Sequence, residues 1–245
     1  MNRAVLCSIL FMLMILPFVP LRAQEIEIVC AESGYMPYYS ADAKKGMFID
    51  FITAFAKIHP QYSFTFVSVP RKRMSVMMEN GSADIFSLNG SMFFDKEKYL
   101  CTTPIWKESS VLFMRKDGTF PFKKANDLFG KRIGTIAGNV YPELDTYFRD
   151  GTISETKVTT SSQLFKMLKA HRIDGFIGDR NTTVFRLKEE GFSDVIVCNS
   201  SPILVFDLTI QLQKKHQLLT DQLNAFIKES KSDGFLQSLN KMYLP

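Results

Sequence analysis

The chain has 245 residues, and its 30 Lys and Arg exceed its 25 Asp and Glu by a small margin. The charges lie singly or in short clusters, which is typical of a solvated surface and predicts no nucleic-acid partner. The length suits either one large domain or two lobes.

The first 23 residues have the pattern of a secretory signal peptide. Arg3 precedes an apolar run from Ala4 to Leu16, and Leu21-Arg22-Ala23 offers a cleavage site after Ala23. The apolar run is shorter than the ~20 residues that a spanning helix needs, and no second hydrophobic span follows it. The sequence therefore predicts export to the periplasm, with residues 24–245 as the mature protein and no membrane insertion after cleavage.

Cysteine and histidine residues are scattered along the mature chain. Cys30, Cys101 and Cys198 form no close pair, and each lies in or beside an apolar, strand-like run. This pattern predicts inert thiols rather than a disulfide framework. The histidines show no zinc spacing and no pairing with a cysteine, so we expect neither a metal site nor a cofactor.

The first part of the mature chain alternates predicted strands and helices. Residues 25–31 and 62–69 read as strands, whereas residues 48–57 and 71–80 carry helical patterns. Another short apolar strand follows the second helix. This alternation predicts an α/β fold, with a parallel sheet and helices on its faces.

The second part repeats the alternation. Residues 109–115 leave the first unit as a strand, and residues 204–213 return to it as another. Between these two strands we expect further strands at 130–139, 158–160 and 195–198, and helices at 125–129, from about 141, at 162–170 and at 182–190. Helices at 218–231 and 234–242 close the chain.

One phrase occurs twice. Met77-Met78-Glu79-Asn80-Gly81-Ser82 runs into Ala83-Asp84-Ile85-Phe86-Ser87-Leu88-Asn89, and Leu168-Lys169-Ala170-His171-Arg172 runs into Ile173-Asp174-Gly175-Phe176-Ile177-Gly178-Asp179. Each copy reads as a helix, a tight turn, an aspartate, a short apolar strand and a polar tip. Two similar lobes that face each other predict a ligand cleft between them.

The order of such segments resembles the family 3 extracellular solute-binding proteins, the polar amino-acid receptors of bacterial ABC importers. Five segments carry the resemblance: Tyr35-Met36-Pro37-Tyr38, Gly46-Met47-Phe48-Ile49-Asp50, Gly81-Ser82-Ala83-Asp84, Asp127 to Gly134 with Ala137-Gly138, and Arg172 to Asp179. The resemblance covers nearly the whole mature chain.

This resemblance implies a periplasmic-binding-protein type II fold, in which two α/β lobes are joined by two hinge strands. We expect residues 24–108 and 203–245 to form the first lobe and residues 109–202 the second. A ligand that contacts both lobes would favour closure. The implied partners are a small polar ligand and the membrane permease of an ABC importer, and we expect the protein to be a monomer.

The resemblance also implies ligand contacts from the first lobe. Tyr35 follows the first strand, where the family packs an aromatic ring on the ligand, and Glu32 falls where an acidic contact is common. Asn89 and Ser91 end the first phrase, where the family presents hydroxyls to the ligand's carboxylate. Tyr35 could instead pack in the core, and Asn89 and Ser91 could serve a turn.

The second lobe would contribute Asp179 and Asn139. Asp179 ends the second phrase, where the family binds the ligand's ammonium group, and an unpaired acid there is a poor core residue. Asn139 follows Gly138 ahead of a predicted helix, so amides there could hold an anionic group. Asn139 could equally serve as a helix cap.

The family's carboxylate-binding arginine is missing. The stretch Phe94 to Leu100, where it is expected, offers Lys96 instead, and a lysine lacks the bidentate fork of arginine. Arg71, which follows Pro70 at the end of a strand, is a possible replacement. It could equally be part of a solvated helix start.

Together these patterns predict a periplasmic solute-binding protein that captures an amino acid or a related carboxylate and performs no catalysis. One alternative is an exported enzyme similar to cyclohexadienyl dehydratases, with Glu32 or Asp179 as a general acid. Another is a ligand-sensing module for a separate receptor. Sensory modules of this kind usually continue into a membrane span, whereas this sequence ends at Pro245.

Overall fold

The computed structural model describes residues 26–32, 34–42, 44–90 and 95–244. The predicted signal peptide lies outside these ranges. Within them, no helix has the length and apolar character needed to cross a bilayer.

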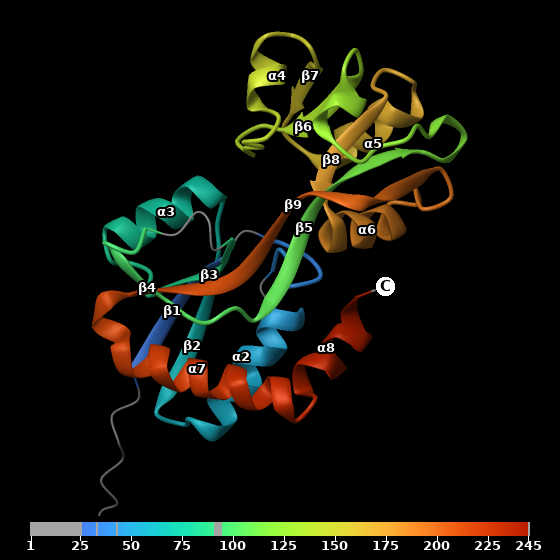
Figure 1. Cartoon of the computed structure of the whole chain (residues 1–245). Coiled ribbons are helices and arrows are strands. Elements are labelled where there is room, and N and C mark those ends of the chain that lie inside the picture. The colour runs from blue at the N-terminus through green and yellow to red at the C-terminus, as the bar shows by residue number, and fades with distance from the viewer. Residues whose placement is uncertain (1–25, 33, 43, 91–94, 245) are drawn as a thin grey trace, which may run out of the picture.

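The elements form two lobes joined by two long strands (Figure 1). The first lobe consists of β1 (Ile26–Glu32), α2 (Met47–Ile58), β2 (Tyr62–Ser68), α3 (Arg71–Glu79), β3 (Ile85–Gly90), β4 (Tyr99–Cys101), α7 (Gln217–Ser232) and α8 (Phe235–Tyr243). The second lobe consists of β6 (Arg132–Ile136), α4 (Asp145–Arg149), β7 (Ser154–Val158), α5 (Ser161–Lys169), β8 (Gly175–Asp179) and α6 (Arg180–Glu189). The hinge strands are β5 (Trp106–Arg115) and β9 (Ile196–Gln213), and short 3-10 helices cover Lys116–Gly118, Ala125–Leu128 and Lys214–His216.

The strands run through both lobes in the order β2-β1-β3-β9-β5-β8-β6-β7, and β4 pairs with β9 beside this path. Within each lobe the neighbouring α/β strands are parallel, whereas the hinge strands pair antiparallel with each other and with the lobe strand beside them. From the outer edge towards the hinge, each lobe has its second, first and third strand in that order: β2-β1-β3 in the first lobe and β7-β6-β8 in the second. Each lobe therefore repeats one arrangement on its own side of the hinge.

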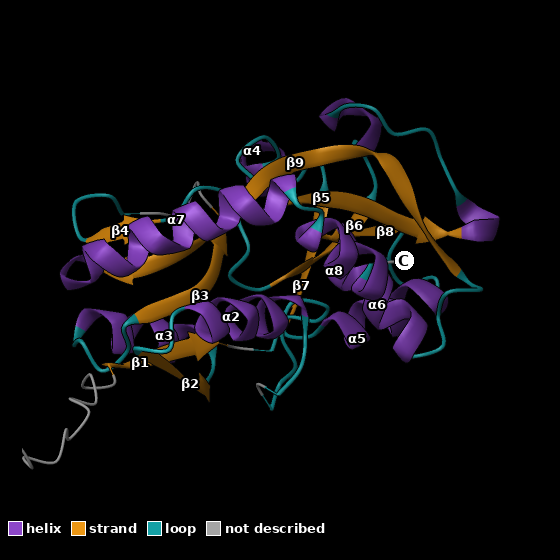
Figure 2. Cartoon of the chain, turned by 90° about the horizontal axis from the view of Figure 1, so that it is seen from below, coloured by secondary structure: helices purple, strands orange, loops and turns teal. Residues whose placement is uncertain are grey.

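The sequence pattern explains how the helices pack. In α2, Phe48, Phe51, Ile52 and Phe55 recur at helical spacing and are all buried against the first lobe's sheet. Gly46 starts this helix at a φ of 131°, where a Cβ would collide with the backbone of Tyr38. Figure 2 shows α2, α7 and α8 along one side of the first lobe.

Each lobe has its own hydrophobic core. The core of the first lobe contains Phe51, Phe55 and Trp106 with residues of α7 and α8, whereas Phe113, Phe165 and Phe176 belong to a core of the second lobe. The predicted α/β class with two lobes is therefore confirmed. The predicted boundaries at residues 108/109 and 202/203 fall inside the continuous strands β5 and β9, and they stay a prediction.

Four sequence-based expectations need correction. The strand expected at 158–160 lies earlier, at Ser154–Val158, because these residues pair with β6 and the chain turns into α5 after them. The expected separate strands 195–198 and 204–213 are one strand, β9, because pairing with β5 carries the chain through the polar segment around Pro202. The expected helix at 125–129 is a short 3-10 helix. The helix expected from about residue 141 starts only at Asp145.

Candidate functional site

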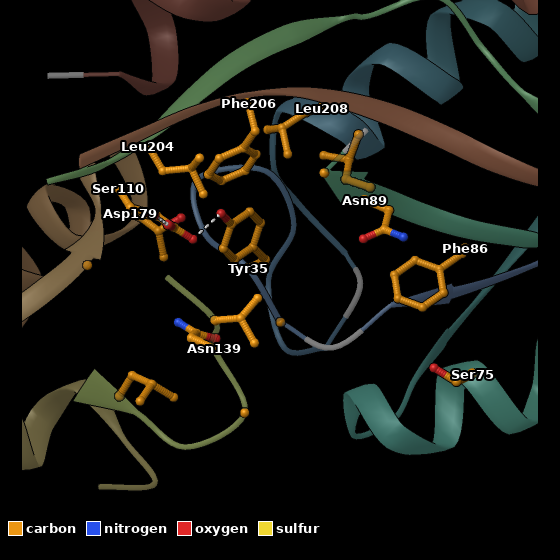
Figure 3. A pocket seen from close by; sticks show the side chains of 18 of the residues that line it. Tyr35, Ser75, Phe86, Asn89, Ser110, Asn139, Asp179, Leu204, Phe206 and Leu208 are labelled. Carbon is orange, nitrogen blue, oxygen red and sulfur yellow. Dashed lines mark hydrogen bonds between the residues drawn. The ribbon is translucent and has the colours of Figure 1, made fainter. Parts of the chain in front are cut away.

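A cavity of about 670 Å³ lies between the two lobes. Residues of both lobes and of both hinge strands line it, and Figure 3 shows how side chains from these elements converge on it. The lining includes Tyr35, Tyr39, Ser75, Phe86, Leu88, Asn89, Lys98 and Tyr99 from the first lobe; Ile136, Asn139, Tyr141, Ser161, Asp179, Thr182 and Arg186 from the second; and Ser110, Leu204, Phe206 and Leu208 from the hinge. Its size is that of a small-molecule site.

Asp179 presents its carboxylate to this cavity. It ends β8 and is the N-cap residue of α6, yet its side chain makes no capping hydrogen bond. Instead Tyr35 donates its hydroxyl hydrogen to Oδ2 at 2.7 Å, and Ser110 donates to Oδ1 at 2.8 Å. Ser110 reaches the carboxylate because it lies opposite Asp179 in the β5–β8 ladder. Asp179 is thus held by neutral donors, one of them from the other lobe.

Tyr35 lies in the loop after β1 and points across the cleft (Figure 3). Its ring stacks on that of Tyr38, with 5.3 Å between the ring centroids. Burial raises the pKa of Tyr35 well above its usual range, and the negative charges of Asp179 and Glu108 raise it further. The hydroxyl therefore remains a proton donor at neutral pH.

A second network crosses from lobe to lobe behind Tyr35. Buried Glu108 of β5 accepts hydrogen bonds from the Tyr38 hydroxyl at 3.1 Å and from the Asn181 amide at 3.3 Å. The Asn181 side chain in turn donates to the Tyr38 hydroxyl at 3.2 Å. Burial raises the pKa of Glu108 to about 7, and the charge of Asp179 adds to this shift. Sequence reasoning missed Glu108 because it precedes the predicted strand.

Asn89 and Asn139 both line the cavity. Asn89 is buried, and its amide donates to Gln211 Oε1 at 3.1 Å. Asn139 is exposed, and its amide donates to the Tyr141 hydroxyl at 3.3 Å. The expected helix start at Asn139 is corrected, because α4 begins at Asp145 with Leu144 as its N-cap. No helix dipole therefore acts at Gly138-Asn139.

Glu32 and Lys96 do not lie where the sequence placed them. Glu32 is fully buried and absent from the cavity lining, because its Oε2 turns back to accept a hydrogen bond from the Gly34 amide at 2.6 Å. Lys96 is exposed, and the turn that contains it brings Asp95 and Lys98 to the cavity instead. Ser91 and the Arg71 side chain lie outside the part of the chain that the structure describes.

Two cationic side chains belong to the described lining. Lys98 lies 3.8 Å from Asp95 and is mostly exposed. Arg186 on α6, which sequence reasoning missed, donates to Glu190 Oε1 at 3.0 Å and to the hydroxyls of Ser161 and Ser162. Neither cation contacts Asp179 in the described residues, which also contain no group of three metal-binding side chains.

No protein-family model matches the chain. Among curated proteins, it is 24% identical over 151 residues to the probable amino-acid-binding protein YxeM of Bacillus subtilis, an alignment that covers 60% of this chain and 56% of that protein. It is 25% identical over 148 residues to the L-cystine-binding protein TcyJ of Escherichia coli K12, covering 60% of this chain and 54% of that protein. The matches thus span about half the length of these relatives.

The fold has similar solved structures. The probable amino-acid ABC transporter extracellular-binding protein ytmK of Bacillus subtilis superimposes with a TM-score of 0.72 at 19% identity, covering 90% of this chain and 99% of that one. The type II fold predicted from the sequence is therefore confirmed, and the relatives agree with the predicted resemblance to the family 3 solute-binding proteins.

Proposed function

We propose that this chain, which resembles the family 3 extracellular solute-binding proteins in motifs, fold and relatives, captures a small polar metabolite and delivers it to an ABC-type importer. One observation carries this proposal. Both lobes line the cavity, and the Tyr35 hydroxyl of the first lobe is hydrogen-bonded to the Asp179 carboxylate of the second.

This contact couples ligand binding to lobe closure. The two lobes are joined by β5 and β9, so bending of these strands would separate Tyr35 from Asp179. A solute held between them contacts both lobes only in the closed form, and it therefore shifts the hinge equilibrium toward that form. A permease that recognises the closed form would distinguish the loaded protein from the empty one.

The proposed ligand contacts come from residues that line the cavity. Asp179 binds a cationic group, Tyr35 packs on the solute, and Asn89, Asn139 and Ser110 supply hydrogen bonds. Of the lysines in the turn after residue 94, Lys98 rather than Lys96 lines the cavity, where its side chain is mostly exposed. Residues 1–23 act as a cleaved signal peptide that places a monomer in the periplasm.

Binding without turnover is part of this proposal. The curated relatives are named as binding proteins, and Asp179 is engaged by neutral hydroxyl donors rather than paired with a second catalytic group. Incubation of the mature protein with prephenate or arogenate should leave both compounds unchanged. Their conversion would favour the dehydratase-like alternative.

The central test is a thermal-shift screen of residues 24–245 against amino acids, small carboxylates and amines. A solute bound only by the folded protein must raise the melting temperature, by an amount that grows with concentration. The Asp179→Ala variant should lose the response to the best solute, whereas Asp145→Ala, which removes an exposed carboxylate on α4, should keep it. If no solute of the screen raises the melting temperature, the proposal is wrong.

A further inference from the structure

We infer that the captured solute is an amine with a hydrocarbon body, whose ammonium group lies on Asp179 and whose hydrocarbon body lies against the side chains of β9. This inference rests on the proposed function and names the class of solute. It departs from the amino acid or carboxylate expected from the sequence.

Asp179 is a carboxylate without a cationic partner among the described residues. Tyr35 and Ser110 each donate one hydrogen bond to it, so each oxygen keeps a free lone pair. The neighbouring Arg180 forms no ion pair with Asp179 among the described residues, and its guanidinium donates instead to the carbonyl oxygens of Asn199 and Ser200 on β9, at 3.1 and 3.0 Å. The carboxylate is therefore left for a cation from outside the protein.

The surroundings of Asp179 make this end of the cavity negative. Buried Glu108 accepts a hydrogen bond from Tyr38, whose ring stacks on that of Tyr35. Burial makes the largest contribution to the raised pKa of Tyr35, and the charges of Asp179 and Glu108 raise this pKa further. Burial also raises the pKa of Tyr141 in the same lobe, and the charge of Asp179 adds to the shift. Such a field favours an ammonium group over a carboxylate. The aromatic ring of Tyr35, which lines the cavity, adds a favourable quadrupole for a cation.

The wall next to Asp179 is apolar. Leu204, Phe206 and Leu208 recur at every second position of β9, and all three line the cavity. Figure 3 shows them beside Tyr35 and Asp179. Leu204 and Phe206 are only half-buried, so they offer apolar surface that a solute can cover. A solute with its amine at Asp179 and a hydrocarbon group about the size of a phenyl ring would cover these side chains of β9.

The cations of the described lining are poorly placed for a ligand's carboxylate. The guanidinium of Arg186 is already used by Glu190 and by two hydroxyls at the start of α5. Lys98 is mostly exposed and lies near Asp95. An α-carboxylate would gain little from these groups, and it would face the negative charge around Asp179. A neutral or apolar group in place of the carboxylate fits better.

A matched set of probes tests this inference by calorimetric titration of residues 24–245. Phenethylamine carries the amine on an aromatic body, phenylacetate inverts the charge, phenylalanine adds the carboxylate, and ethanolamine removes the apolar body. Phenethylamine should bind at least about tenfold more tightly than each of the other three, a ratio that titration readily resolves. Phenylacetate should not bind.

Two variants assign the binding to the named groups. Asp179→Asn keeps the shape and should weaken phenethylamine binding by about 100-fold, and Phe206→Ala should weaken it by about tenfold. Asp145→Asn, an exposed carboxylate of the same lobe, should bind phenethylamine as the wild type does. Circular dichroism of each variant confirms that it is folded.

The outcomes separate this inference from the proposed function. If charged amino acids or phenylacetate bind and phenethylamine does not, the chain still captures solutes but the inferred class is wrong. If phenethylamine binds equally well to Asp179→Asn, the assigned amine contact is wrong. If no probe and no solute of the thermal screen binds, the proposed function itself falls.

Discussion

The two copies of the repeated phrase hold the same place in the sheet. β3 lies between β1 and β9, and β8 lies between β6 and β5. The Asp84 amide donates to the Val29 carbonyl and its Oδ2 accepts from the Val29 amide, and Asp174 makes the same pair of bonds with Arg132. The two aspartates thus hold the start of β3 beside β1 in the first lobe and the start of β8 beside β6 in the second.

The copies differ at their tips. Asn89 is buried and donates to Gln211 on the hinge strand β9, whereas Asp179 turns its carboxylate to the cavity. In both copies the aspartate makes the hydrogen bonds to the backbone of the neighbouring strand. The last residue of each copy is not needed for these bonds, so its side chain can differ between the lobes. The first copy therefore brings a neutral amide to the cavity and the second copy brings a carboxylate.

Glu108 is the clearest difference between the two hinge strands, because β5 places this buried carboxylate between the lobes and β9 carries no buried acid along its described length. Its pKa of about 7 lies far above the ordinary value, so between roughly pH 4.5 and 7 the folded state holds a proton that the unfolded state releases. Stability should therefore fall as pH rises through this window. The loss should approach roughly 3 kcal/mol at pH 8.

Replacing Glu108 by Gln should remove this dependence. In urea unfolding at pH 5, 6.5 and 8, Glu108→Gln should gain stability relative to the wild type as pH rises, because no buried charge forms. Glu143→Gln removes an exposed carboxylate of the second lobe and should keep the wild-type slope. Equal slopes for wild type and Glu108→Gln would mean that Glu108 is not destabilised by its surroundings.

Asp84 should contribute more to the stability of the fold than Asp174, its counterpart in the second copy of the repeated phrase. The Asp84 side chain is 11% exposed and also binds Lys215 and His216, whereas the Asp174 side chain is 32% exposed and binds Arg132. Asp84→Ala leaves buried donors unsatisfied and should cost about 3 kcal/mol, but water can replace Asp174, so Asp174→Ala should cost about 1 kcal/mol. Urea midpoints at pH 7 measure both losses.

The pH dependence of these losses provides an independent check. Burial raises the pKa of Asp84, but hydrogen bonds from Lys215, the Val29 amide and His216 outweigh this and leave it below its ordinary value. The hydrogen bond from Arg132 lowers the pKa of Asp174. The stability that each carboxylate adds is therefore present above the unfolded pKa, near 4, and is lost on further acidification. Equal losses for the two variants at pH 7 would contradict the comparison.

The fold was predictable because its signals are local. Alternating strands and helices and the doubled aspartate phrase are visible in short windows of sequence. The hinge was harder, since residues 199–203 contain polar residues and a proline, and only pairing with β5 makes them part of one strand. Local propensity cannot report such a pairing.

The candidate site was predictable only in part, for the same reason. Tyr35, Asn89, Asn139 and Asp179 follow predicted strands or turns, and all line the cavity. Ser110 and Phe206 were missed because their contact with the cavity depends on the register of hinge strands. Glu32, like Tyr35, was expected to face the ligand because it lies at the end of the first strand. Its carboxylate instead accepts a hydrogen bond from the Gly34 amide.

Gly134 in β6 and Ala31 in β1 hold equivalent positions in the two lobes, and giving either position the other's residue should destabilise the protein. Gly134 pairs with Phe176 as Ala31 pairs with Phe86. A Cβ at Gly134 would lie 2.5 Å from Leu164 Cδ2 and 2.8 Å from Ile173 Cδ1. Gly134→Ala should therefore cost about 2 kcal/mol through overpacking, and Ala31→Gly should cost about 1 kcal/mol through backbone entropy and lost packing. A Gly134→Ala protein as stable as the wild type would show that this core can yield.

The smallest expected difference concerns the helices that precede the two phrases. Thr160 and Gln163 form a capping box at the start of α5, whereas Pro70 before α3 has no side-chain group that can cap. Thr160→Ala should therefore cost about 1 kcal/mol, seen as a lower urea midpoint, and Thr119→Ala, an exposed threonine of the same lobe, should cost much less. Since α3 lacks this contribution, hydrogen exchange should be faster in the first turn of α3 than in that of α5. Equal exchange would mean that packing of Met74 and Met77 against the first lobe offsets the missing cap.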